Sequence, residues 1–347
     1  MANMLVYITK RILMTIPMIL ILIVLTWFLA YLMPGDPTSF FPPTTSPSKI
    51  AEFRELWGLD KPWYGQLWTY LQGLFHGDLG ESIQVSPGAK VVDLMAVYIP
   101  RSIQIAIFPI MLIPFIGIKT ALVSVKNKDK WQDTFVRGLS VLLISTPAFF
   151  FALILQLIFG YWLPTNFGED FINIPVIGLF SHELGSPPTF TGFRLIDCLL
   201  ANDLHLFLDT VEHLILPVAC QTLLTFAVVT RQTRTSLLDI LDQDYIRTAR
   251  AKGCSRDFVY NKHALRNALI PATTVIVVNA AYLLAGSVII EISFGIRGMG
   301  MIFIEALTTN DYWLIVGNVL YVGIVIILGN LLADCLYTII DPRIIYK

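Results

Sequence analysis

Six long apolar runs dominate this sequence and restrict what the chain can fold into. They lie at about residues 12–33, 103–123, 139–163, 214–230, 269–292 and 314–340. A helix rises about 1.5 Å per residue and the hydrocarbon core of a bilayer is about 30 Å thick, so about 20 apolar residues make one span. Only 14% of the 347 residues are charged, against about 25% in a soluble domain. We therefore expect an all-α, polytopic integral membrane protein with about six transmembrane helices.

Two of these runs are less regular than the others. The first follows Lys10 and Arg11, as the apolar core of a signal peptide would. It is 22 residues long, however, whereas a signal-peptide core has roughly 7–15 residues and ends at a small-residue cleavage site. We expect it to be retained as the first span. The fourth run is the weakest, because Glu212 and His213 precede it closely and Pro217 interrupts it.

The Lys and Arg residues are distributed unevenly along the chain. If the N-terminus is cytoplasmic, 17 of the 24 lie on the cytoplasmic side, which is the side that basic loops prefer. We therefore expect a multi-pass protein of the cell membrane with both termini in the cytoplasm. Residues 34–101 and 164–209 then form long outer loops and residues 231–266 a cytoplasmic loop, within a single transmembrane domain of residues 1–347.

Several functional classes are disfavoured by motifs that the sequence lacks. It has no Gly-x-x-x-x-Gly-Lys-Ser/Thr phosphate loop, and it has neither the His-Glu-x-x-His nor the Gly-x-Ser-x-Gly motif of hydrolases. Its four cysteines show no Cys-x-x-Cys spacing, so a metal cluster is not expected. The net charge of −1 gives no reason to expect a nucleic-acid partner. We expect no catalytic residue, metal or cofactor on this chain.

The loop at residues 231–266 carries the most informative pattern. Apolar residues recur there at helical spacing, beside basic ones, at Leu237, Leu238, Leu241, Tyr245 and Ala249. Gly253 suits the C-terminus of a first helix, and Ser255 suits the N-cap of a second. The pattern predicts a helix–glycine–helix element that docks into a groove of another protein. A solvated basic loop that only sets the topology remains the alternative on periodicity alone.

The amino-acid sequence of this loop resembles that of a known family. Residues 244–253 read Asp-Tyr-Ile-Arg-Thr-Ala-Arg-Ala-Lys-Gly and residues 263–271 read His-Ala-Leu-Arg-Asn-Ala-Leu-Ile-Pro. They are similar to the cytoplasmic loop of binding-protein-dependent ABC importer permeases, and within these to the B-type permease of the dipeptide/oligopeptide/nickel branch. The family's broad Glu-Ala-Ala-x-x-x-Gly pattern is altered here, because Arg247 and Thr248 replace its first two positions while Ala249 and Gly253 remain.

The resemblance extends over nearly the whole chain. Residues 34–37 (Pro-Gly-Asp-Pro), 58–62 (Gly-Leu-Asp-Lys-Pro), 77–82 (Gly-Asp-Leu-Gly-Glu-Ser) and 341–343 (Asp-Pro-Arg) match the B-type permeases in order and spacing. One departure follows the fifth run, where the family usually has Phe-x-x-Pro-Gly-x-Gly. This chain has Arg297 at the proline position, which predicts a less rigid turn or a more basic outer surface.

The resemblance implies a type I ABC importer permease fold and a role as half of a translocation pathway. Peptides are the first expectation for the cargo, with nickel or oligosaccharides as alternatives. The implied partners are a second, C-type permease, two ATPase subunits that hold ATP and Mg, an extracellular solute-binding protein and membrane lipid. The ATPase-coupling residues would be Asp244, Tyr245, Arg247, Ala249, Arg250, Lys252 and Gly253, where Gly253 permits a bend and Ala249 a close approach.

Polar residues inside apolar runs are candidates for a translocation path. Gln156, Asn279, Ser287 and Glu291 qualify, although hydrogen bonding between helices, or an interfacial position for Glu291, would also explain them. A self-sufficient secondary transporter or channel is a rival function. It would require buried acidic pairs or broken helices in matching halves, and the sequence displays neither. A membrane-embedded assembly or receptor subunit without transport activity is a third, weaker possibility.

Overall fold

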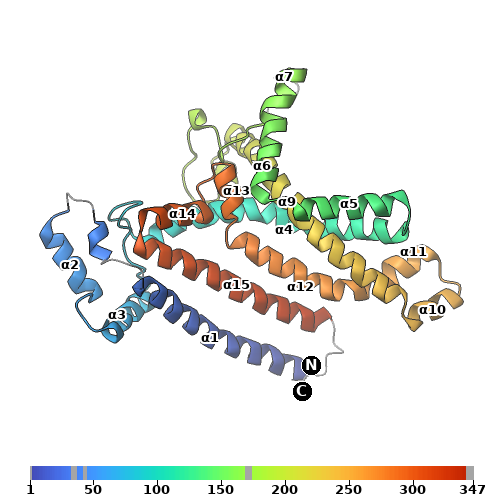
Figure 1. Cartoon of the computed structure of the whole chain (residues 1–347), viewed down its shortest axis with the longest axis horizontal. Helices are drawn as coiled ribbons and strands as arrows, with labels where there is room; N and C mark the ends of the chain where they lie inside the picture. The colour runs from blue at the N-terminus through green and yellow to red at the C-terminus, as the bar shows by residue number, and fades with distance from the viewer. Residues whose placement is uncertain (1, 33–36, 42–44, 169–173, 341–347) are drawn as a thin grey trace.

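The computed structural model is an all-α fold whose long helices run roughly along its longest dimension (Figure 1). It describes residues 2–32, 37–41, 45–168 and 174–340, so most of the motif at 34–37 and all of 341–343 lie outside the described residues. Six helical stretches in these ranges are long and apolar enough to cross a membrane: Val6–Leu29, Val91–Lys126, Ala148–Phe167, Leu204–Leu241, Arg256–Leu284 and Tyr312–Leu336. The predicted fold class and number of spans are confirmed.

Five long helices form the bundle. They are α1 (Ala2–Tyr31), α4 (Val91–Lys126), α9 (Leu204–Leu241), α12 (Leu265–Leu284) and α15 (Tyr312–Ile340). Helix α4 packs against α9, α9 against α12, α12 against α15, and α15 against α1. The fourth run, which the sequence makes the weakest, becomes the most buried of the six spans. Pro217 lies inside α9 without ending it, because neighbouring helices can compensate for the missing hydrogen bond.

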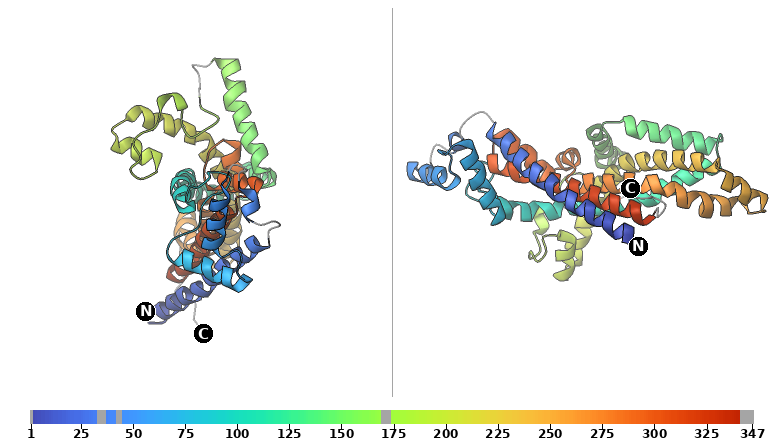
Figure 2. Two further views of the ribbon diagram at one scale, coloured as in Figure 1. Left: turned by 90° about the vertical axis from the view of Figure 1, so that its left-hand side faces the viewer. Right: turned by 90° about the horizontal axis from the view of Figure 1, so that it is seen from below.

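The third predicted span, residues 139–163, is wrong in its boundaries. The structure divides it into α5 (Trp131–Ser145) and a second segment made of α6 (Ala148–Leu157), η2 (Ile158–Trp162) and α7 (Leu163–Phe167). The break falls at Thr146, whose ψ of 123° is extended, because a residue before proline avoids the helical conformation. Helix α5 lies along α4 and α9, whereas α6 and α7 leave the bundle at a steep angle (Figures 1 and 2).

The fifth predicted span, residues 269–292, also ends earlier than expected. Helix α12 stops at Leu284, and Gly286 takes a φ of 108° that only glycine adopts readily. Two short helices follow, α13 (Val288–Ser293) and α14 (Met299–Thr309), before α15 begins. Residues 285–292 are therefore a turn and a separate helix, and the span that the structure supports is Arg256–Leu284.

The outer segments are largely helical. The first contains η1 (Pro37–Phe40), α2 (Pro47–Trp57) and α3 (Trp63–Phe75), and its last residues, 91–101, already belong to α4. The second contains α7, η3 (His182–Leu184) and α8 (Arg194–Leu200), and α9 begins within it at Leu204. Trp57 and Tyr70 pack against Trp313 at the start of α15, with ring centroids 4.0 and 6.3 Å away. The first outer segment is thus fixed to one end of the bundle.

The opposite end of the bundle carries the segment that the sequence predicts as a helix–glycine–helix element. It consists of α10 (Asp244–Ala251), α11 (Arg256–Phe258) and the π-helical turn η4 (Val259–Ala264), which continues directly into α12. The first residues of α1 and the last residues of α15 lie at the lower edge of the bundle in Figure 1, away from the outer segment around α2.

Candidate functional site

Residues 244–266, here called the basic foot, are seated on the bundle through one apolar side. Ile246 of α10 is fully buried and Ala249 nearly so. They belong to a core cluster with Leu237 and Leu241 of α9, Val259, Tyr260 and Ala264 of η4, Ala268 of α12, and Ala121 and Val125 of α4. The cluster joins three bundle helices to the foot, so a force on the foot is transmitted directly to α4, α9 and α12.

A glycine turn separates the two helical parts of the foot. The N–H groups of Gly253 and Cys254 donate to the carbonyls of Arg250 and Ala249, at 3.0 and 3.2 Å, which is the Schellman pattern of a helix C-terminus. Gly253 has a φ of 80° and no neighbouring atom within 4 Å of where a Cβ would lie. The Ser255 hydroxyl then accepts from the N–H of Phe258 and caps the second part. The predicted helix–glycine–helix element is confirmed.

The side of the foot that faces away from the bundle is basic. Its exposed cations are Arg247, Arg250, Lys252, Arg256, Lys262 and Arg266. Against these six, residues 244–266 contain two acidic residues, Asp244 and Asp257. Asp257 pairs with Lys126 of α4 at 2.6 Å, which ties the start of α11 to the bundle. The outer side of the foot therefore has an excess of positive charge beside an apolar seat.

One predicted coupling residue occupies a position other than the one that the pattern suggests. Tyr245, predicted as part of the apolar stripe, is 42% exposed, and its hydroxyl accepts a hydrogen bond of 2.7 Å from Asn267. The buried position falls instead to Ile246, which the pattern misses because a new helix starts at Asp244. Ala249, which belongs to the same stripe, is buried in the chain's own core cluster as the pattern predicts, and its small size serves packing there.

A buried carboxylate beside the foot escapes sequence reasoning. Asp133 of α5 accepts two hydrogen bonds of 3.0 Å from Arg234 of α9 and one from Ser124 of α4. Burial alone would raise the pKa of Asp133, but these hydrogen bonds, with one from the backbone N–H of Asp129, lower it to about 2. The group locks α4, α5 and α9 together at the end that carries the foot. In the sequence, nothing distinguishes Arg234 from the other basic residues of the loop.

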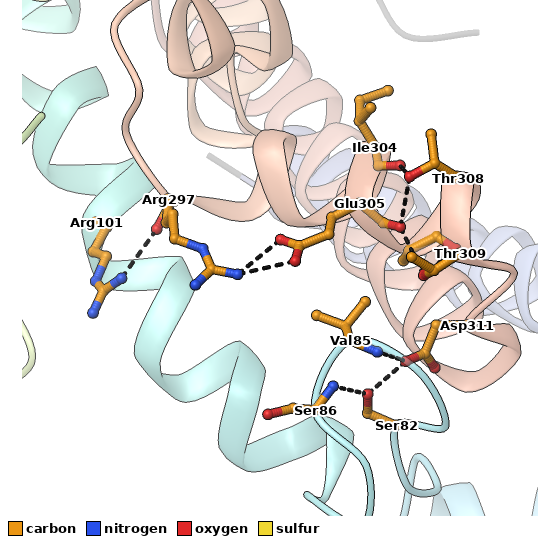
Figure 3. Close-up of polar contacts among 11 residues, drawn as sticks. Ser82, Val85, Ser86, Arg101, Arg297, Ile304, Glu305, Thr308, Thr309 and Asp311 are labelled. Carbon is orange, nitrogen blue, oxygen red and sulfur yellow. Dashed lines mark hydrogen bonds and ion pairs between the residues drawn. The ribbon is translucent and has the colours of Figure 1, made fainter. Parts of the chain in front are cut away.

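At the other end, the residue that replaces the family's proline makes an ion pair. Arg297 donates to both carboxylate oxygens of Glu305 in α14, at 2.8 and 3.1 Å, and its carbonyl accepts from Arg101 (Figure 3). The turn after α13 is therefore held to α14 and α4 by side chains. This provides a restraint where the family usually has a proline ring.

A second buried carboxylate fixes the outer segment. Asp311, directly before α15, accepts hydrogen bonds from the Ser82 hydroxyl and the backbone N–H of Val85 (Figure 3). It also accepts from the backbone N–H groups of Ile83 and Gln84. Its side chain is fully buried. Because these donors lie more than 220 residues earlier in the chain, nothing local in the sequence points to the pairing.

Three of the four predicted pathway residues lie at α13: Ser287 is its N-cap, Glu291 lies within it, and Gln156 bonds to its last residue. Asn279 lies apart from them in α12. Glu291 is 1% exposed and accepts from Ser102 and from the N–H groups of Gly300 and Met301, so it caps α14. Gln156 donates to the carbonyls of Val176 and Ser293 at 3.0 and 2.8 Å. For these two, the alternative of hydrogen bonding between segments fits the geometry.

The remaining two pathway candidates are less constrained. Asn279 donates to the carbonyl of Val275 in its own helix, and Ser287 stands at the N-cap of α13 without a capping hydrogen bond from its side chain. Within the described ranges, no group of three or more His, Cys, Asp or Glu side chains is arranged to hold a metal ion.

Comparison with known proteins gives two family matches. The sequence model described as "Binding-protein-dependent transport system inner membrane component" matches residues 113–346. The model described as "Binding-prot-dependent transport system membrane comp, N-term" matches residues 4–87. The first match includes the whole basic foot, and the second includes most of α1 and most of the first outer segment.

Individual relatives align over almost their full length. The dipeptide transport system permease protein of Alkalihalophilus pseudofirmus is 33% identical over 347 residues, covering 99% of this chain and 100% of that protein. The protein of the same name from Escherichia coli is 34% identical over 352 residues, with the same coverage. The probable D,D-dipeptide transport system permease protein of Escherichia coli is 35% identical over 323 residues, 92% of each chain.

Proposed function

Since this chain belongs to the family of binding-protein-dependent transport system inner membrane components, we propose that it conducts peptides across the membrane as one permease of an ABC importer. Three relatives that align over most of their length are named as dipeptide permeases. The resemblance noted in the loop sequence is thereby confirmed at the level of the family. The chain itself is a transport subunit, and ATP is hydrolysed on separate subunits.

The basic foot is the observation that carries the coupling part of this proposal. Its apolar side is already used, because Ile246 and Ala249 are buried against α9 and α4. Its basic side is exposed, with Arg247 and Arg250 projecting from α10. A partner that docks here therefore meets guanidinium groups, which suit carboxylates through paired hydrogen bonds. We propose an acidic cleft of an ATPase subunit as that partner.

The remaining parts of the assembly follow from the same premise. The chain pairs with a second permease, a solute-binding protein delivers peptide to the end that carries α2 and α3, and both termini lie in the cytoplasm. The excess of Lys and Arg at the foot end supports this orientation. Nickel and oligosaccharides remain alternative cargoes that rest on the wider family alone.

The coupling proposal is tested by reversing charge on the foot. Arg247→Glu/Arg250→Glu should abolish co-purification of this chain with the ATPase subunits of its importer, because two attractive contacts become repulsive. ATP-dependent peptide uptake in liposomes should fall with it. The matched control is Lys128→Glu/Lys130→Glu, which changes the same charge in the exposed turn between α4 and α5 and should leave co-purification intact.

Three results would count against the proposal. Unchanged co-purification of the foot variant would remove the foot as the docking surface, and equal loss in the control would show a general charge effect. Uptake by this chain alone, driven by an ion gradient in liposomes without ATPase subunits, would favour the secondary transporter instead.

A further inference from the structure

A cavity of about 250 Å³ lies between α5 and α9, beside the Asp133–Arg234 pair. Val136, Arg137 and Ser140 of α5 line one side, and Thr230, Arg231 and Thr235 of α9 line the other. Neither the basic foot nor the polar residues expected in a translocation path take part in it. It is therefore a separate feature of the molecule whose chemistry the transport function does not explain.

The cavity lies where both of its helices change from apolar to basic. Residues 226–229 of α9 (Phe-Ala-Val-Val) are apolar and are followed directly by Thr230 and Arg231, while α5 turns apolar from Leu139 onward. On the polar half of α5, Trp131 and Phe135 are 73% and 61% exposed. Exposed aromatic rings next to cations mark the level of lipid headgroups. The cavity is thus at the membrane boundary on the foot side.

The positive charge of the cavity is not balanced within the described part of the chain. Arg234 is satisfied by Asp133, both of whose carboxylate oxygens accept from it. Arg137 reaches the same carboxylate only at 3.6 Å. Arg231 is exposed and forms no ion pair among the described residues. Two guanidinium groups therefore face a cavity that contains no unshared carboxylate.

We propose that this cavity binds the phosphate headgroup of an anionic phospholipid in the leaflet on the foot side of the membrane. Arg137 and Arg231 bind the phosphate from opposite walls, since a guanidinium matches phosphate oxygens in pairs. Val136 and Val141 border the cavity and offer an apolar surface to the acyl chains. The bound lipid bridges α5 and α9, next to the Asp133 lock. This site is independent of the proposed cargo.

Binding is measured by titrating the purified full-length chain in neutral detergent with dihexanoyl-phosphatidylglycerol. Dihexanoyl-phosphatidylcholine serves as the zwitterionic comparison. Because a basic residue near anionic lipid contributes about 1 kcal/mol, the two arginines should favour the anionic lipid by about tenfold or more. The variant Arg137→Gln/Arg231→Gln should lose this preference. The control Lys128→Gln/Lys130→Gln removes the same charge at the same end of the bundle and should retain it.

Several results would overturn the proposal. They are an equal affinity for the two lipids, a preference that survives in Arg137→Gln/Arg231→Gln, or equal loss in the lysine control. Complete displacement of the lipid by inorganic phosphate at matched concentration would show a site for free phosphate and would also reject it. Size-exclusion profiles confirm that each variant is folded, and Arg137→Lys, which keeps the charge without the planar fork, should bind with intermediate affinity.

Discussion

Three buried carboxylates, on Asp133, Glu291 and Asp311, hold the ends of helices in this chain. Each accepts from donors far away in sequence: Arg234 lies 101 residues from Asp133, Ser102 lies 189 from Glu291, and Val85 lies 226 from Asp311. A buried carboxylate is tolerable only with such partners. The sequence flags Glu291 because it stands in an apolar run, but it contains no local sign of what any of the three binds.

Replacement of Asp133 by asparagine should make stability less dependent on acid. The folded-state pKa of Asp133 is about 2, below the ordinary value of 3.8. Its contribution is therefore complete above the ordinary pKa and is lost as the pH falls towards 2. Asp133→Asn should lower the unfolding midpoint at pH 7, because Arg234 loses its buried partner, and the gap to the wild type should narrow between about pH 4 and pH 2.

Thermal unfolding in detergent from pH 7 to pH 2 checks this prediction. Asp239→Asn, at an exposed carboxylate of α9, is the control and should follow the wild type at every pH. If the difference in unfolding midpoint between Asp133→Asn and the wild type stayed constant from pH 7 to pH 2, the lowered pKa of Asp133 would be contradicted.

At the scale of elements, turns that depend on glycine and proline can be predicted from the sequence. The helix faces that become buried cannot, because they depend on tertiary packing. Gly253 and Ser255 predict the two parts of the foot correctly. The apolar stripe predicts Tyr245 as buried, but the chain restarts a helix at Asp244 and turns Ile246 inward. Hydropathy also joins the second half of α5 to α6, because both are apolar, although Pro147 separates them. Which helix faces meet depends on tertiary packing and not on periodicity.

The foot should be more sensitive to the backbone conformation required at Gly253 than to the volume of the side chain at that position. Gly253→Ala should destabilise α10 by about 1 kcal/mol, because a Cβ is unfavourable at positive φ. Gly253→Asn should cost less, since asparagine tolerates this conformation. Hydrogen exchange of the amides at 248–252 should speed up by about fivefold in the alanine variant.

Gly138 provides the matched control for that experiment. It lies in α5 and, like Gly253, has no neighbouring atom within 4 Å of the place that a Cβ would occupy, but its φ is not positive. Gly138→Ala should leave exchange in the foot unchanged and stabilise α5 slightly. Equal effects of alanine at the two positions would refute the backbone explanation.

At the scale of the whole molecule, the first outer segment and the last span form one unit. Trp57, Tyr70 and Trp313 share a core cluster, and Asp311 holds the backbone at residues 83–85. Composition and hydropathy predict the number of spans, although not all of their boundaries. They cannot predict that Trp57, Tyr70 and the backbone at residues 83–85 contact the start of α15, because these contacts join distant parts of the sequence.

Asp311→Asn should loosen this unit. The carboxylate oxygens of Asp311 now accept from backbone N–H groups. An asparagine amide would place a donor against these donors, which should lower the free energy of unfolding by about 2–3 kcal/mol. Amide exchange at residues 82–85 should rise and the unfolding midpoint should fall. Glu305→Gln removes an exposed ion pair with Arg297 and should cost less than about 1 kcal/mol. Similar losses in both variants would contradict the role given to Asp311.

The two ends of the bundle should be reachable from opposite sides of the membrane. Cys254 in the foot and Cys335 in α15 are partly exposed, whereas Cys198 and Cys220 are buried, so the experiment uses a Cys335→Ser background. A membrane-impermeant maleimide should label Cys254 in inside-out vesicles only. A cysteine introduced by Trp68→Cys, at an exposed position of α3, should be labelled in right-side-out vesicles only. Labelling of both positions from one side would refute the proposed topology.

The π turn η4, which is part of the foot, continues into α12 without any loop between them. A π turn bonds each residue to one five positions away and so contains one residue more than an α turn. If that surplus residue were released into regular helix, α12 would twist by about 100° about its own axis, the angle of one helical step. A small displacement of the foot along the axis of α12 would then rotate the residues of α12 about that axis, while the Gly253 turn stayed intact.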